Sequence, residues 1–158
     1  IDQDQFEIKS SQGVRVLDGK KVKSFVWLDS ATQTPHYFVN GRDLRNAEKV
    51  RLFGFYEVLV DGELTLLSKT EAVIKEPTYN EKFDVGKRET QILKKTKFYY
   101  LDRNLLQEVP PNRKKFFPLF GQHAAEMERY AKTNKLSTSN AGHLTAIFLR
   151  YNSILATN

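Results

Sequence analysis

The sequence predicts an α+β fold, a curled antiparallel β-meander that is partly closed and is followed by a C-terminal three-helix subdomain. Up to residue 109 apolar side chains recur with a period of two, Pro110-Pro111 then breaks the pattern, and the later apolar residues recur about every 3.6 positions. Strands followed by helices are typical of α+β domains. We therefore expect one domain over residues 1–158, with residues 1–109 mainly antiparallel strands and residues 110–158 helical and packed on them.

The first strands are expected on either side of an Asp-Gly turn. Residues 13–17 and 22–28 are rich in apolar side chains and flank Asp18-Gly19. Asp-Gly is a strong hairpin signal because glycine takes a positive φ without a Cβ clash. A further short strand is predicted at residues 36–39, ended by Asn40-Gly41, and residues 42–48 are interpreted as a loop.

The clearest hairpin lies in the middle of the chain. Residues 52–60 run into Asp61-Gly62, and the chain returns through residues 63–68. Both sides of the first strand are mostly apolar, so this hairpin is expected at the centre of the sheet. More strands are predicted at residues 72–74, 90–93, 97–101 and 105–109. The polar stretch from Lys75 to Glu89 is expected to be a long loop and the least ordered internal segment.

Three helices are predicted after the double proline. Asn112 is expected to cap the first, over residues 113–120, and the second fits residues 122–134 with Asn134 ending it in the left-handed conformation. The third is expected to start at Ser137 or Ser139. Its apolar stripe has helical spacing and consists of Leu144, Ile147, Phe148, Tyr151 and Leu155.

Composition excludes several classes of protein. The chain has 158 residues, 40% of them hydrophobic, which is enough for one core without disulfides or a metal. It has no cysteine, which excludes disulfides, thiolate catalysis and cysteine-based metal sites. The longest apolar runs, such as residues 55–60, are far shorter than the ~20 residues of a membrane-spanning helix, so no transmembrane segment is predicted.

Charge is distributed unevenly along the chain. Residues 86–158 hold 13 Lys/Arg and 5 Asp/Glu, a net charge of +8, whereas residues 1–85 hold 12 and 14, a net charge of −2. Two basic segments are interleaved with aromatic residues, a combination used by proteins that bind single-stranded nucleic acid. They give these candidate ligand-binding residues: Lys94, Lys95, Lys97, Tyr99, Arg113, Lys114 and Lys115.

An alternative interpretation of the same segments is structural, and we favour it. The aromatic rings are needed to bury a domain of this size, and the lysines then lie solvated on its surface. Nucleic acid is therefore not the favoured partner. Any binding to it should be non-specific and should disappear by about physiological salt, because it depends on counterion release.

The sequence carries no motif for a known cofactor and no convincing catalytic group. It lacks the phosphate-binding, dinucleotide-binding, nucleophile-elbow and zinc-protease motifs. His123 and Glu126 share one face of a predicted helix, but two ligands are too few for a metal site. Glu57 is a carboxylate inside an apolar strand. It could have a raised pKa in a hydrolase pocket, but we favour a solvent-facing side chain or a lysine pair. No cofactor, metal or catalytic residue is predicted, and enzymatic activity is left open with a non-catalytic role preferred.

Several segments together resemble a known family. They include the pattern V-L-x-D-G-x-x-x-L from Val58 to Leu66, the Tyr-Tyr-Leu strand at residues 99–101 and a helical tail with Tyr151-Asn152. Over about residues 14–154 the chain resembles a family of uncharacterised exported proteins of Bacteroidetes-type bacteria, whose members carry a signal peptide. The resemblance implies export to the periplasm or cell surface. It implies no activity and no catalytic residue.

The expected function follows from these points. The chain begins at Ile1 and its only methionine is Met127, so we expect a leader to be removed near Ile1. We expect an exported envelope protein that acts as a non-catalytic binding or structural module, with an envelope protein or an anionic polymer as partner. The alternative is binding of nucleic acid or another anionic polymer through the basic C-terminal half. A hydrolase with a site near Glu57 is the third hypothesis.

Overall fold

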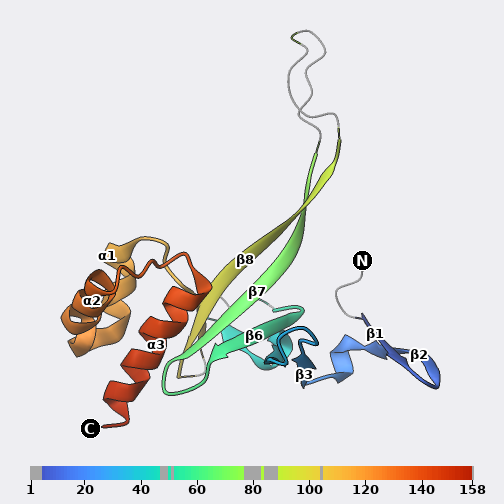
Figure 1. Cartoon of the computed structure of the whole chain (residues 1–158), viewed down its shortest axis with the longest axis horizontal. Helices are drawn as coiled ribbons and strands as arrows, with labels where there is room; N and C mark the ends of the chain where they lie inside the picture. Colours follow the sequence, from blue (N-terminus) through green and yellow to red (C-terminus); the bar gives the residue numbers. More distant parts are fainter. Residues whose placement is uncertain are drawn as a thin grey trace.

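The computed structural model describes residues 5–46, 50, 52–76, 83, 89–103 and 105–157. A curled sheet and a C-terminal helical region lie side by side, which confirms the predicted α+β class (Figure 1). The strands are β1 (Gln5–Ser10), β2 (Gly13–Asp18), β3 (Ser24–Leu28), β4 (Pro35–Asn40), β5 (Arg45–Asn46), β6 (Phe55–Val60), β7 (Thr65–Lys75), β8 (Gln91–Asp102) and β9 (Leu105–Glu108). The 3₁₀ and α-helices are η1 (Gly19–Lys21), η2 (Gly41–Asp43), α1 (Arg113–Phe116), η3 (Phe117–His123), α2 (Ala124–Thr133) and α3 (Ala141–Leu155).

The main sheet has seven strands in the order β3-β4-β6-β7-β8-β9-β5. All neighbours are antiparallel except β5 and β9, which pair in parallel with Arg45 opposite Leu105. Because β5 follows β4 closely in sequence yet pairs at the other edge, the sheet must curl into a half-barrel. The β6–β7 hairpin lies at its centre, as predicted from its two apolar faces.

The predicted hairpin at Asp18-Gly19 is wrong. β2 pairs with β1 in a separate two-stranded sheet, and β3 pairs with β4. Asp18 instead caps η1, where its Oδ1 accepts the backbone N–H of Lys20 at 2.9 Å. An Asp side chain that bonds to the backbone two residues later stabilises many kinds of turn, so the local signal fits both outcomes.

The strands predicted at residues 72–74, 90–93 and 97–101 are parts of two longer strands. β7 and β8 pair continuously from Thr65 opposite Leu101 to Lys75 opposite Gln91. Beyond the other strands, residues 69–75 of β7 and 91–97 of β8 continue as a two-stranded ribbon, here called the arm (Figure 1). In the loop predicted from Lys75 to Glu89, residues 77–82 and 84–88 lie outside the described residues, and so does the prediction of its low order.

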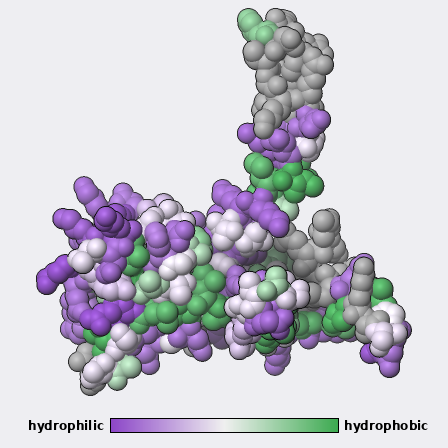
Figure 2. Space-filling view, in the orientation of Figure 1, coloured by the Kyte–Doolittle hydropathy of each residue, from purple (hydrophilic) through white to green (hydrophobic). Residues whose placement is uncertain are grey.

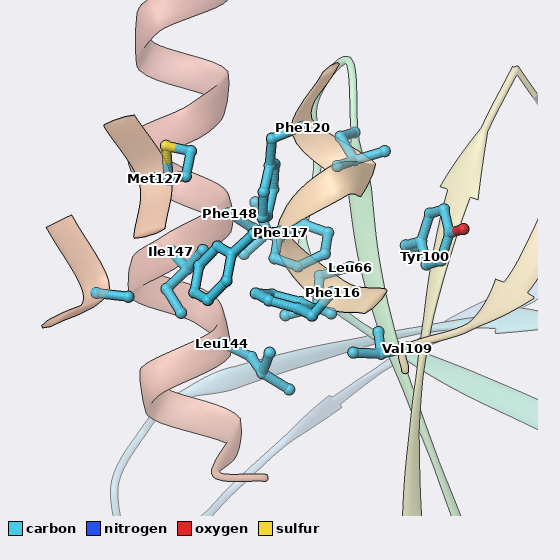
Figure 3. Packing of buried hydrophobic residues seen from close by; sticks show 13 residues of the cluster. Leu66, Tyr100, Val109, Phe116, Phe117, Phe120, Met127, Leu144, Ile147 and Phe148 are labelled. Atoms are coloured by element: carbon cyan, nitrogen blue, oxygen red, sulfur yellow. The ribbon is translucent and has the colours of Figure 1, made fainter. Parts of the chain in front are cut away.

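Successive residues of the sheet point to two faces with separate cores. The inner face of the curl carries a cluster of Tyr56, Leu67 and Leu106. The outer face carries Leu66 and Tyr100, which pack against the helical region. Figure 3 shows this outer core, where the packed residues are Val109, Phe116, Phe117, Phe120, Met127, Leu144, Ile147 and Phe148.

The three-helix count is not confirmed. α1 is a single turn of four residues that continues as the 3₁₀ segment η3, which contains Pro118 near its start and Gly121 at φ 53°. Besides α1 and η3, the described helical region contains two longer helices, α2 and α3. Lys135, rather than Asn134, adopts the left-handed conformation. α3 is capped by Asn140, whose Oδ1 accepts the N–H of His143 at 3.0 Å, and not by Ser137 or Ser139.

The last helix is tied to the central hairpin by Asn152. Its Nδ2 donates to the carbonyl of Leu64 at 3.1 Å, and its Oδ1 accepts the Leu64 N–H at 3.0 Å. Gly62 approaches so closely that a Cβ there would lie 2.8 Å from Cγ of Asn152. Two of the motifs in the family resemblance, the Asp-Gly hairpin and the Tyr-Asn tail, therefore meet in space at this contact.

Stability should depend on alkaline pH through Tyr56. This side chain is 2% exposed, and burial raises the pKa of its phenol from 10 to about 12. The unfolded chain then loses this proton first, so the free energy of unfolding should fall as pH rises from about 10 to 12. We expect this loss to be smaller in Tyr56→Phe by up to about 2–3 kcal/mol. Urea denaturation of both proteins at pH 9 and pH 12 measures the difference, and equal losses would contradict it.

Candidate functional site

The structure does not gather the predicted site residues into one patch. In β8, Lys95, Lys97 and Tyr99 point to one face of the ribbon and Lys94 points to the other. The three cations at residues 113–115 lie on α1, in the helical region, whereas the outer half of β8 lies in the arm (Figure 1). Lys97 is also engaged, because its Nζ lies 3.3 Å from Oε2 of Glu108, whose carboxylate raises the pKa of Lys97.

The aromatic residues of the two basic segments contribute to packing. Phe116 and Phe117 are buried in the outer core. The half-buried Tyr99 meets Tyr56 edge to face on the inner side, with ring centroids 5.3 Å apart. The guanidinium of Arg113 lies over the ring of Phe117 at 5.0 Å. These rings do not form an exposed platform on which bases could stack.

The outer part of the arm carries an exposed apolar band, consisting of Val73, Ile74, Ile92 and Leu93. Val73 lies opposite Leu93 on one face of the ribbon, and Ile74 lies opposite Ile92 on the other. These side chains are between 40% and 71% exposed. On the visible side of the arm, Figure 2 shows hydrophobic atoms with hydrophilic ones toward the body and toward the tip. At these two neighbouring residue pairs, both faces of the ribbon are therefore apolar and exposed to solvent.

Closer to the body, the arm is polar and its side chains are paired. Lys69 Nζ lies 2.7 Å from Oε1 of Glu71, and this hydrogen bond lowers the pKa of the Glu71 carboxyl. Across the strands, the hydroxyls of Thr70 and Thr96 lie 2.8 Å apart. These polar side chains at the base of the arm thus bond to one another, which distinguishes the base from the apolar band.

Glu57 belongs to a different side-chain cluster, on the outer face. Its Oε1 lies 2.5 Å from Nδ1 of His36, and its Oε2 accepts the hydroxyl of Ser68 at 3.1 Å. The expected lysine pair is therefore wrong, since the partners are a histidine and a serine, and the side chain is 25% exposed. The carboxylate lies between the serine and the histidine, whereas a nucleophilic triad has the histidine in the middle. The arrangement therefore differs from that of such a triad.

The second histidine–carboxylate pair also serves a structural contact. His123 Nδ1 lies 3.8 Å from Glu126, whose Oε1 accepts a hydrogen bond from Arg150 on α3 at 3.0 Å. Within the described ranges, no three His, Cys, Asp or Glu side chains lie together as a metal site would require. None of the described helices is long and apolar enough to cross a membrane.

Sequence reasoning missed a groove beside β5, here called the arginine-rimmed groove. It has a volume of about 550 Å³ and is lined by Arg42, Leu44, Arg45, Asn46, Val50, Leu52, Phe53 and Leu105. A neighbouring hollow of about 510 Å³ shares Leu44, Arg45 and Leu105 and adds Arg103. The predicted loop at residues 42–48 contains part of η2 and the short strand β5. No periodic pattern marks these residues, so no sequence signal points to this groove.

Comparison with protein-family models, with curated proteins and with solved structures found no match for this chain. The functional argument therefore depends on the residues and their geometry.

Proposed function

We propose that this chain is an exported, non-catalytic binding module that docks on another protein of the cell envelope through the apolar band of its arm. The observation that carries the proposal is the exposure of Val73, Ile74, Ile92 and Leu93 on both faces of a projecting ribbon. Exposed apolar groups that are gathered in one place mark interaction surfaces more often than scattered ones do. Export is supported by the family resemblance alone.

The edges of the arm favour a protein over a bilayer. β6 pairs with β7 only as far as Ser68, and β9 pairs with β8 only from Tyr99 onward. In the outer arm, the backbone groups that point away from the ribbon therefore have no partner strand among the described elements. Hydrocarbon cannot satisfy such groups, whereas a protein groove or an added strand can. A protein partner thus accommodates the two open edges as well as the two apolar faces.

Burial of the apolar band would supply enough free energy for specific docking. Complete burial of an aliphatic side chain contributes about 1.5–3 kcal/mol, so the four side chains of the band could together outweigh the ordering of a few loops at the interface. None of the four side chains of the band belongs to either core cluster of the described residues, so we expect their substitution to leave folding intact.

A photo-cross-linking residue at position 92 tests the proposal in the native host. We expect one defined adduct with a protein of the envelope fraction, and a much weaker adduct when Ile74→Thr is added. The control position is Val14 on β2, which is similarly exposed and apolar but lies outside the arm.

Stability measurements complete the test. Ile74→Thr combined with Ile92→Thr should leave the free energy of unfolding within about 0.5 kcal/mol of the wild type, because both residues are exposed strand positions. Equal adducts from positions 14 and 92, or adducts only with cytoplasmic proteins, would show the proposal to be wrong. Unfolding of the double variant would show that the band serves folding instead.

A further inference from the structure

The main sheet ends at β3, and no described strand pairs with the side of β3 that faces away from β4, here called the free edge. Toward β4, the Asn40 N–H donates to the Lys23 carbonyl at 2.8 Å, and the Asp29 N–H donates to the Thr34 carbonyl at 3.0 Å. Backbone groups alternate in direction along a strand, so every second residue between Lys23 and Asp29 also bonds toward β4. The residues whose N–H and C=O groups point to the free edge are Ser24, Val26 and Leu28.

The free edge of β3 lacks the features that usually keep an edge strand from pairing. Edge strands are commonly very short, or carry charges, proline or a bulge. At the other end of the sheet, β5 has only two residues, and the arm carries Lys94 and Lys95. Between Lys23 and Asp29, in contrast, the chain reads Ser-Phe-Val-Trp-Leu and pairs with β4 without a bulge. The apolar side chains of β3 that are between 53% and 58% exposed are Val26, Trp27 and Leu28.

From this geometry we propose that β3 pairs with β3 of a second copy of the chain, antiparallel and about a two-fold axis at Val26. In this register Val26 lies opposite Val26 of the second copy, and Ser24 lies opposite Leu28. All of the outward backbone groups of both strands then form hydrogen bonds across the axis. The two sheets become one continuous sheet, in a closed dimer of the commonest symmetry. This surface is separate from the apolar band of the arm, so the two proposals can fail independently.

The charges at the two ends of β3 favour a second copy over a different protein. The same register places Lys23 of each copy opposite Asp29 of the other, so symmetry forms this pair twice. Opposite charges that face each other on neighbouring strands are stabilising, whereas like charges are destabilising. A shift of the axis by one residue in either direction separates Lys23 from Asp29 and leaves outward groups of β3 beyond the paired region. The backbone groups and the charges therefore select the same register.

Trp27 makes the pairing measurable, because it is the only tryptophan and it lies on β3. Sedimentation equilibrium of the purified protein should show the mass rising from one chain to two as concentration increases. The emission maximum of Trp27 should shift to shorter wavelength over the same concentrations. Val26→Lys places two ammonium groups face to face at the axis, so it should raise the dissociation constant of the dimer at least about tenfold.

Two matched controls isolate the position and the charge. Val14→Lys changes a valine of β2 that is 57% exposed, against 58% for Val26, and it should leave the dimer intact. Lys23→Glu places a carboxylate opposite Asp29 and should weaken the dimer severalfold at low salt, with a smaller effect at high salt. Lys132→Glu makes the same charge change at an exposed position of α2 and should have no effect. Circular dichroism verifies that each variant is folded.

Hydrogen exchange followed by NMR tests the register on the unsubstituted protein. The amides of Phe25 and Trp27 bond to β4 and should exchange slowly at every concentration. The amides of Ser24, Val26 and Leu28 should become slow only at concentrations where the dimer forms. This alternation decides the question even if Val26→Lys does not fold.

Three outcomes would overturn the proposal. The first is a monomer at every concentration. The second is a dimer that Val14→Lys disrupts and Val26→Lys does not, because the contact would then lie on the β1–β2 hairpin. The third is slow exchange of the Val26 amide in the monomer, because another segment of the same chain would then cover the free edge.

Discussion

Phe116→Ala is expected to lower the free energy of unfolding by about 3–5 kcal/mol. Phe116 is fully buried and packs against Phe117, Phe120 and Phe148, with ring centroids 5.1–6.4 Å apart. Truncation therefore removes apolar surface from the centre of the outer core and leaves a cavity that the surrounding rings cannot fill. Equilibrium denaturation in urea measures the loss, and a change below about 1 kcal/mol would contradict this description of the core.

The matched control lies on the same turn of the chain. Lys114 and Lys115 immediately precede Phe116 and are exposed. Lys114→Ala combined with Lys115→Ala should stay within about 0.5 kcal/mol of the wild type, as surface substitutions usually do. A loss comparable to that of Phe116→Ala would mean that α1 is held by its charges and not by its buried ring.

Asn152→Ala is expected to destabilise the protein by about 2–4 kcal/mol. The substitution leaves both the N–H and the C=O of the buried Leu64 without the side-chain partners that they have now. A buried backbone group that loses its partner costs about 1–3 kcal/mol. Denaturation in urea, followed by tryptophan fluorescence and by circular dichroism, measures the effect.

Two comparisons isolate the role of the Asn152 amide. Asn152→Asp keeps an acceptor for the Leu64 N–H but places a carboxylate oxygen against the Leu64 carbonyl, so at neutral pH it should be destabilised too. Asn134→Ala is the control, because this exposed asparagine makes a side-chain bond only to the end of its own helix. If Asn134→Ala lowers the free energy of unfolding as much as Asn152→Ala does, the hydrogen bonds between Asn152 and Leu64 contribute no more to stability than an exposed side-chain bond.

The elements that were predicted well from the sequence are those with a buried side. β6 and β7 are apolar enough to mark the centre of the sheet, and the stripe of Leu144, Ile147 and Phe148 on α3 is fully buried as its spacing indicates. In each case the apolar pattern marks the buried side of the element, so the element can be predicted without knowing what it packs against.

The sequence predicts the arm as separate short strands because this ribbon has no buried side. Lys94, Lys95 and Thr96 interrupt the apolar pattern and so predict a gap between two strands, although β8 continues through them. Alternation requires one buried face, and this part of the ribbon has none. The cap of α3 presents a different difficulty, because several good capping residues lie within four positions and only the structure identifies Asn140 as the cap.

The candidate sites could be predicted only in part. The sequence drew attention to Lys94 and Lys95, which flank the apolar band, but it gave no reason to select Ile74 or Ile92 over other apolar residues. The arginine-rimmed groove depends on a two-residue parallel pairing between segments about 60 positions apart, and such a short pairing leaves no periodic trace.

The outer face of the half-barrel also sets the order in which the chain can fold. Among the described residues, its apolar surface around Leu66 and Tyr100 is covered largely by residues from Val109 onward, which are synthesised after the strands of the sheet. A nascent chain that has emerged only as far as residue 109 therefore presents this surface to solvent, and the Asn152 tie does not yet exist. Partly made sheets of this kind are ready substrates for chaperones.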